Sequence, residues 1–372
     1  MVRQDASTTL KNNCRGNLQP AIGRLRDQWS VRQLVPNLFG IKHIVKHFFV
    51  RRWFLLALAI VLAVGITQSS ILAPLSERKM LRYGIVAIVL FLMALPLDAR
   101  AMWKAMRRPW APLLAVVINF GLLPLVAWGV SFGLSREMAG GLYVAAATPC
   151  TLASAAVWTR RAGGNDSVAI LVTVITNLIC VLLTPLWLFA MTGERADIAE
   201  LSLANMITKL ALLVVLPMAL AQLIRLIPGV AEVATRRKTP IGVLAQFGVL
   251  SMIFIGAIRT GVKLMADEDL AYHLFDIGLM IVAVLGLHLA MMVVGMVAAF
   301  YLRFPREDRI AVGIAGSQKT LMVGLQMGLE LGLSVLPIVV YHVGQLLLDT
   351  IIADRLRANE SAAKSGSAKA NS

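Results

Sequence analysis

The sequence predicts an all-α polytopic membrane protein with ten transmembrane helices. Apolar residues make up 58% of its 372 residues and charged residues only 15%, whereas a soluble domain is about half apolar and about a quarter charged. The apolar residues gather in segments close to the ~20 residues that cross a bilayer. The ten predicted spans are 53–69, 81–97, 110–131, 140–158, 166–191, 205–226, 240–260, 274–302, 309–331 and 333–353.

Basic residues lie in alternate loops between these segments, and the mixed first loop is the exception. By the positive-inside rule the basic loops are cytoplasmic, so we expect both termini in the cytoplasm and the chain in the cell inner membrane. The net charge of +16 therefore reflects topology, and the expected partner is the lipid bilayer rather than nucleic acid. The basic residues of these loops are Arg100, Lys104, Arg107, Arg108, Arg160, Arg161, Arg236, Arg237, Lys238, Arg303, Arg306, Arg309, Arg355 and Arg357.

The two ends of the chain differ from its middle. Residues 1–50 are basic and weakly patterned, so we expect a cytoplasmic N-terminal extension without a secretory signal, in which 37–50 suits an interfacial amphipathic helix. Residues 51–357 hold the membrane domain. Residues 358–372 are rich in Ala, Ser and Lys, and we expect a disordered cytoplasmic tail.

Five segments precede the loop at 192–204 and five follow it. An odd number of spans reverses the orientation of the second half, so 53–191 and 205–356 are predicted to be inverted repeats. The fourth segment of each half is interrupted. Pro149 breaks the first because it lacks a backbone donor, and Gly316 begins the second interruption. Interruptions at matching positions predict a substrate site there.

The second interruption places four consecutive polar side chains, from Ser317 to Thr320, inside an apolar span. In a regular helix some of them would face lipid, which is costly. We therefore predict a broken helix that lines a cavity enclosed by protein, with Gln318, Lys319 and Thr320 as binding residues. Lys319 lies roughly ten residues from either segment end, beyond easy snorkelling. Its ammonium could replace a sodium ion or exchange a proton, so Na+ and H+ both stay open as the coupling ion.

Oxygen-bearing side chains also lie in and near the first break. Thr173, Thr176 and Asn177 share one face of the fifth span, and Ser154 ends the break. Hydroxyl and amide oxygens, together with carbonyls freed at a break, suit a hard cation. The alternative is that these groups bond to their own helix or join helices. Asn119 lies in the middle of the third span, where its amide needs partners.

Other side chains allow further chemistry. His288 and His342 lie within spans and are either part of a proton or polar network or ordinary hydrogen-bonded core histidines. Cys150 follows Pro149 and could bind a soft metalloid, or it is an inert buried thiol. No HExxH, P-loop or Ser-His-Asp signature is visible. We therefore expect no enzymatic activity, no organic cofactor and no resident metal.

Residues 53–357 resemble the bile acid:sodium symporter superfamily, and most closely its SBF-like bacterial branch, which is related to the vertebrate seventh-member solute carrier 10 group. The resemblance lies in the stretches 110–128, 148–185, 315–324 and 337–345, of which GSQKT and YHxxQ are the most specific pieces. It implies ten spans and an inverted repeat whose fourth and ninth helices cross at their breaks. Spans 3–5 and 8–10 would form a core domain, and spans 1, 2, 6 and 7 a panel.

The resemblance carries over to individual positions. Ser154 and Thr173 match oxygen donors of the first sodium site in sodium-coupled members. Asn119 replaces a glutamine of the third helix by its shorter homologue, and Gln318 matches a glutamine of the ninth helix.

Three positions depart from the family's pattern. Ala155 replaces an asparagine, Ile314 replaces the glutamate that bridges both sodium sites, and Lys319 is added. The resemblance therefore implies a secondary transporter with an incomplete sodium site, in which Lys319 is a surrogate cation. We expect it to move a small organic anion by alternating access. The alternatives are a regulatory membrane protein that controls ion homeostasis and an arsenite-type metalloid exporter, and the oligomeric state stays open.

Overall fold

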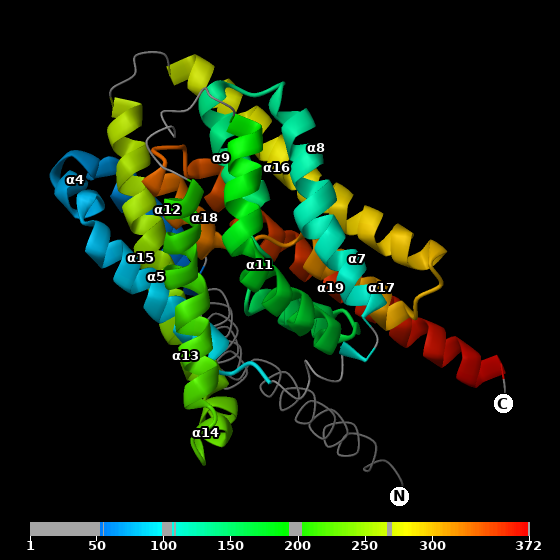
Figure 1. Ribbon diagram of the computed structural model, residues 1–372. Helices are drawn as coiled ribbons and strands as arrows, with labels where there is room; N and C mark the ends of the chain where they lie inside the picture. Colours follow the sequence, from blue (N-terminus) through cyan, green and yellow to red (C-terminus); the bar gives the residue numbers. More distant parts are fainter. Residues whose placement is uncertain are drawn as a thin grey trace, which may run out of the picture. The chain divides into compact units, whose positions relative to one another are not determined.

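The computed structural model describes residues 53–54, 56–98, 106–107, 109–192, 203–265 and 270–370, with the backbone alone for 270–273 and 359–370 (Figure 1). The regular elements in these ranges are all helices, which confirms the predicted fold class at that level. From Leu58 onward, the helices discussed below belong to one unit. The predicted N-terminal extension at 1–50 lies outside the described residues.

The helices of the first half follow the predicted segments. A helix at Leu56–Thr67 bends by 101° into α4 (Ser69–Glu77). The third segment is helical throughout but contains a π-helical turn, η2, in its middle. After the first helix come α5 (Lys79–Ala94), α7 (Trp110–Val117), η2 (Ile118–Leu122), α8 (Leu123–Ser131), α9 (Arg136–Ala147), α10 (Ser154–Arg161) and α11 (Asp166–Thr192).

The second half is also helical, and its fourth segment is divided as predicted. Its elements are α12 (Leu203–Leu210), η5 (Ala211–Val215), α13 (Leu216–Ile224), α14 (Val230–Arg236), α15 (Lys238–Met265), α16 (Leu270–Tyr301), α17 (Arg306–Ser317), α18 (Leu321–Glu330) and α19 (Leu336–Ala370). In the described ranges, six helices are long and apolar enough to cross a membrane, or seven if the bent pair forms one span. The helix α5 and the pieces of both divided segments are shorter than the 18 residues required of a candidate span. The count of ten spans therefore stays a prediction, and so does the inverted repeat.

The last helix, α19, extends beyond the predicted membrane domain. The residues from 358 to 370, which we expected to be disordered, continue α19 as far as Ala370. Alanine has the highest helix propensity of the residues, and an existing helix extends without a new nucleation cost. The Ala-rich segment therefore prolongs α19.

The helices form two groups by their contacts. The helices α4, α5, α13 and α15 pack on one another and lie at the left of Figure 1, and with α12 we call them the panel. The helices α7–α11 and α16–α19 pack together around the two breaks, and we call them the core. The panel meets the core where α5 and α15 contact α18 and where α12 contacts α11.

Candidate functional site

The two helix breaks meet inside the core. The first break separates α9, which ends at Ala147, from α10, which begins at Ser154. The second separates α17, which ends at Ser317, from α18, which begins at Leu321. The backbone N–H of Thr320 donates to the carbonyl oxygen of Pro149 at 2.8 Å. This hydrogen bond joins the two extended stretches directly.

The first break follows from local sequence. Thr148 precedes Pro149 and has an extended backbone, with φ −79° and ψ 158°, because the proline ring disfavours a helical conformation in the residue before it. The second break contains no proline and depends on tertiary contacts. The Gln345 side chain on α19 accepts from the Lys319 N–H at 2.8 Å and donates to the Lys319 carbonyl at 2.9 Å. Gln345 thus replaces the backbone partners that Lys319 loses outside a helix.

Gly316 does not open the second break, which corrects our expectation. It lies in the last turn of α17, and the extended backbone begins at Gln318. A Cβ at Gly316 would lie 3.3 Å from Ile118 Cγ2. The glycine therefore allows α17 to approach the third span closely, rather than supplying an unusual backbone conformation.

The ammonium of Lys319 lies in a cage of oxygens. Its Nζ donates to the main-chain oxygen of Asn119 at 2.6 Å, to Asn119 Oδ1 at 3.2 Å and to the main-chain oxygen of Thr148 at 2.8 Å. It also lies 5.0 Å from the centre of the Phe120 ring, which adds a cation–π contact. The Lys319 side chain is buried among these groups.

The main-chain oxygen of Asn119 is available because of the π-helical turn around it. The N–H of Leu123 donates to Ile118, five residues back. The next donor in that register would be Pro124, which has no N–H. The carbonyl of Asn119 therefore lacks this donor and accepts the ammonium instead. A π-turn inside a helix is often found at a functional site.

The amide of Asn119 faces the other way and caps α17. Its Nδ2 donates to the carbonyl oxygens of Ala315 at 3.3 Å, Gly316 at 3.2 Å and Gln318 at 2.9 Å. These are orphan carbonyls of a helix C-terminus, which need partners when buried. Asn119 thus fixes the second break and binds Lys319 at the same time.

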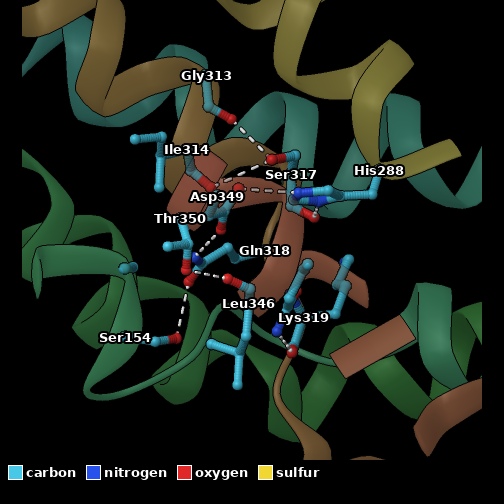
Figure 2. A network of polar contacts seen from close by, with 12 residues as sticks. Ser154, His288, Gly313, Ile314, Ser317, Gln318, Lys319, Leu346, Asp349 and Thr350 are labelled. Atoms are coloured by element: carbon cyan, nitrogen blue, oxygen red, sulfur yellow. Dashed lines mark hydrogen bonds and ion pairs between the residues drawn. The ribbon is translucent and has the colours of Figure 1, made fainter. Parts of the chain in front are cut away.

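Gln318 joins the first break to α19 (Figure 2). Its Oε1 accepts from Thr151 Oγ1 at 2.6 Å and from Ser154 Oγ at 3.0 Å. Its Nε2 donates to Asp349 Oδ2, and the Asp349 carboxylate is fully buried. Ser154 and Gln318, both predicted site residues, are therefore in direct contact.

Residues of the fifth predicted span form hydrogen bonds with the backbone of the first break. Thr173 Oγ1 donates to the Thr151 carbonyl at 3.1 Å, and Thr176 Oγ1 accepts from the Cys150 N–H at 3.2 Å. Asn177 Nδ2 donates to the Cys150 carbonyl at 2.9 Å. Among the described residues, Asn177 Oδ1 is buried without a hydrogen-bond partner. An unpaired buried acceptor is costly.

Three other predicted site residues, His342, Thr320 and Cys150, lie in the core but differ in their contacts. His342 Nδ1 lies 2.9 Å from Gln345 Nε2, so it orients the amide that holds Lys319. The side chain of Thr320 is buried. Cys150 is enclosed, with its sulfur 3.7 Å from Thr173 Oγ1. In the described part of the chain, no group of three His, Cys, Asp or Glu side chains could hold a metal ion.

Sequence reasoning missed three residues of this network. Thr151 and Gln345 lie inside stretches that we singled out, but a hydroxyl or an amide alone does not indicate its partner. Asp349 carried a clearer signal, because an acidic residue within a span is rare. His342, Gln345 and Asp349 are spaced three and four residues apart, which places them on one face of a helix.

Comparisons with known proteins identify the family of the chain. The model of the SBF-like CPA transporter family matches residues 52–358. The chain is 22% identical over 328 residues to "Sodium/bile acid cotransporter 7" of Rattus norvegicus, which covers 83% of this chain and 93% of that protein. It is 27% identical over 273 residues to "Uncharacterized sodium-dependent transporter YocS" of Bacillus subtilis (strain 168), with 72% and 80% covered. These matches confirm the resemblance seen in the sequence, and the names indicate a transporter rather than an enzyme.

Proposed function

Because the chain belongs to the SBF-like CPA transporter family, we propose that it is a secondary active transporter that moves a small organic anion across the cell inner membrane by alternating access. In this proposal it has ten spans in two inverted repeats, and both termini are cytoplasmic. The names of its relatives, a sodium/bile acid cotransporter and a sodium-dependent transporter, support transport as the general function.

The observation that carries the proposal is the Lys319 ammonium at the crossing of the two breaks. The N-terminal ends of α10 and α18 follow the same breaks, and helix N-termini carry a partial positive charge. A fixed cation next to two such ends favours an anionic group over a cationic or neutral one. A carboxylate on a small organic solute fits this requirement.

The same ammonium supports transport without a bound sodium ion. It is bound by two carbonyl oxygens and an amide oxygen, which are hard ligands of the kind that an alkali cation prefers. A lysine in that position supplies one positive charge permanently attached to the protein. We propose that Lys319 takes the place of a transported sodium ion.

Contacts between the panel and the core suggest which conformation the structure represents. Glu330, at the end of α18, pairs with Lys209 of α12 and accepts from Tyr83 of α5 at 3.1 Å. Arg259 of α15 donates to the carbonyl of Leu329 at 2.6 Å. In the proposed topology these contacts lie at the external end of the site. We propose that they close the external side and that transport requires them to open.

The test is flux of radiolabelled monocarboxylates and dicarboxylates into proteoliposomes that contain only the purified full-length chain. We expect accumulation of at least one of these anions in sodium-free buffer, and loss of that accumulation in Lys319→Ala. Lys238→Ala, at the start of α15 and away from the breaks, is the matched control. Anion-dependent thermal stabilisation without any flux would favour a regulatory protein, and the transporter proposal would then be wrong.

A further inference from the structure

A histidine and a carboxylate form a buried pair beside the second break (Figure 2). His288 of α16 and Asp349 of α19 are both fully buried. His288 Nε2 lies 3.0 Å from Asp349 Oδ1, and His288 Nδ1 lies 3.3 Å from the main-chain oxygen of Ser317. Both nitrogens of the ring therefore face an oxygen that accepts hydrogen bonds.

This geometry favours a particular number of protons on the pair. A neutral imidazole has one N–H and one lone pair, so a neutral His288 beside an ionised Asp349 would direct a lone pair at an oxygen. Two arrangements avoid this conflict. Either His288 is an imidazolium beside a carboxylate, or Nδ1 carries the proton and a protonated Asp349 donates to Nε2. Both arrangements contain one proton more than neutral histidine with a carboxylate.

The contacts of Asp349 show what the extra proton does to the charge of the pair. Within the described residues, Asp349 Oδ1 is hydrogen-bonded to His288 Nε2, and Asp349 Oδ2 accepts from the neutral amide of Gln318. The Gln318 amide cannot easily reverse, because its oxygen accepts from Thr151 and Ser154. An isolated carboxylate in such a place is expensive. The extra proton makes the His288–Asp349 pair neutral overall.

We infer that the His288–Asp349 pair is a proton-binding site and that this proton is the coupling ion of the carrier. The inference rests on the proposed transport function. Loading adds one proton to the pair from the open side, and unloading returns it to the other side. Unloading removes a hydrogen bond either to the Ser317 carbonyl or to Asp349. Because Ser317 and Gln318 begin the second break, its position depends on whether the proton is bound.

Other titratable groups near the pair have partners of their own. Tyr341 packs edge-on against His288, with ring centres 5.9 Å apart, and donates to the Ser317 carbonyl at 2.7 Å. The Lys319 ammonium points away to Asn119 and Thr148, and His342 bonds to Gln345. Cys150 lies against Thr173, and Asp354, farther along α19, pairs with Arg161 at its surface. The extra proton therefore belongs to His288 and Asp349.

The first test measures the proton directly and needs no substrate. Nitrogen-15 NMR of histidine-labelled full-length chain in lipid nanodiscs, with His288→Gln to assign the signal, reports which ring nitrogens carry protons. We expect Nδ1 of His288 to be protonated in the wild type, and the ring signals to change once as the pH is raised and the pair loses its proton. In Asp349→Asn the side-chain oxygen must accept from Gln318, so the amide nitrogen donates to Nε2 and the ring should stay neutral with Nδ1 protonated at every pH. Asp354→Asn, on the same helix but at the surface, should titrate like the wild type. An unprotonated Nδ1 in the folded wild type at every pH would overturn the inference.

The second test measures coupling, with whichever anion the flux assay identifies. For one coupled proton, a pH difference of one unit across sodium-free proteoliposomes should raise accumulation about tenfold. Asp349→Asn should lose this response, and Asp354→Asn should keep it. Anion flux that does not change with the pH difference would refute proton coupling and leave the transporter proposal intact. If no anion moves at all, the transport function and the coupling both fail, and the NMR result still decides whether the pair holds a proton.

Discussion

The ammonium of Lys319 lies 2.6 Å from the main-chain oxygen of Asn119, so a cation attached to the ninth predicted span is bound by the third. Asn119 also caps the carbonyls at the end of α17. One residue thus sets the position of the break and provides ligands to the charge that the break exposes. Movement of α17 relative to the third span would disturb both sets of contacts together, which links the charge at the site to the conformation of the core.

The first prediction concerns the charge of Lys319. Lys319→Ala should abolish transport or make it depend on an added cation, because the oxygens of Asn119 and Thr148 then lose their positive partner. Lys319→Arg should not rescue, since a guanidinium is larger and planar and does not fit among oxygens arranged around a compact ammonium. The measurement is initial flux in sodium-free and sodium-containing proteoliposomes, with Lys238→Ala as control. Sodium-dependent wild-type flux that Lys319→Ala leaves unchanged would show that the lysine has no part in coupling.

The second prediction concerns the support of the first break. Thr173→Ala removes the hydroxyl that donates to the Thr151 carbonyl, and Thr151 in turn bonds to Gln318. An unpaired buried carbonyl costs about 1–3 kcal/mol, so we expect flux to fall about tenfold with normal expression. Thr208→Ala is the control, because that hydroxyl bonds back to Ala204 on an exposed face. Equal fluxes for the two variants would contradict a role for Thr173.

The third prediction concerns topology. Alternating basic loops place position 198 outside and position 237 in the cytoplasm. When the chain is cut after position 198 and fused to alkaline phosphatase, which is active only after export, the fusion should be active. When it is cut after position 237 and fused to a reporter that is active only in the cytoplasm, that reporter should be active. Reversal at either position would break the ten-span arrangement and with it the assignment of the external end.

Local patterns in the sequence indicate where a helix breaks, but not which contacts hold the break. Pro149 and the polar run around Lys319 mark the two breaks, because each conflicts with a membrane helix by itself. The start of the second break could not be read from the sequence, since Gly316 serves close packing against Ile118 and the break is held by Gln345. These are tertiary contacts between residues that lie far apart in the chain.

Asp349 was overlooked for a different reason. It falls four residues before the predicted end of its segment, where an acidic side chain can reach the interface. The structure continues α19 well beyond that point and turns Asp349 toward His288 and Gln318. How deeply a residue of a long helix is buried depends on the helices packed around it. The sequence of that one helix does not show those neighbours. Its spacing from His342 and Gln345 was the available signal.

The fourth prediction concerns the contacts that close the external side. Glu330 is the core residue that meets both Lys209 and Tyr83 of the panel. Glu330→Gln keeps an acceptor for Tyr83 but removes the charge that pairs with Lys209. A partly exposed ion pair contributes up to about 1 kcal/mol, so the outward-open population should rise up to about fivefold.

A cysteine at Ser334 can report this opening, because Ser334 is buried and lines a cavity with Arg259 and Lys263 between panel and core. In a background without the native cysteines, a membrane-impermeant maleimide added outside should label Ser334→Cys faster when Glu330→Gln is also present. Glu232→Gln, which removes an exposed pair with Arg236 on α14, is the matched control and should not change the rate. Labelling that stays the same or slows in Glu330→Gln would mean that the Lys209–Glu330 pair does not hold the external side closed. The conformational cycle would then have to be controlled within the core, through the breaks that Lys319 and Asn119 join.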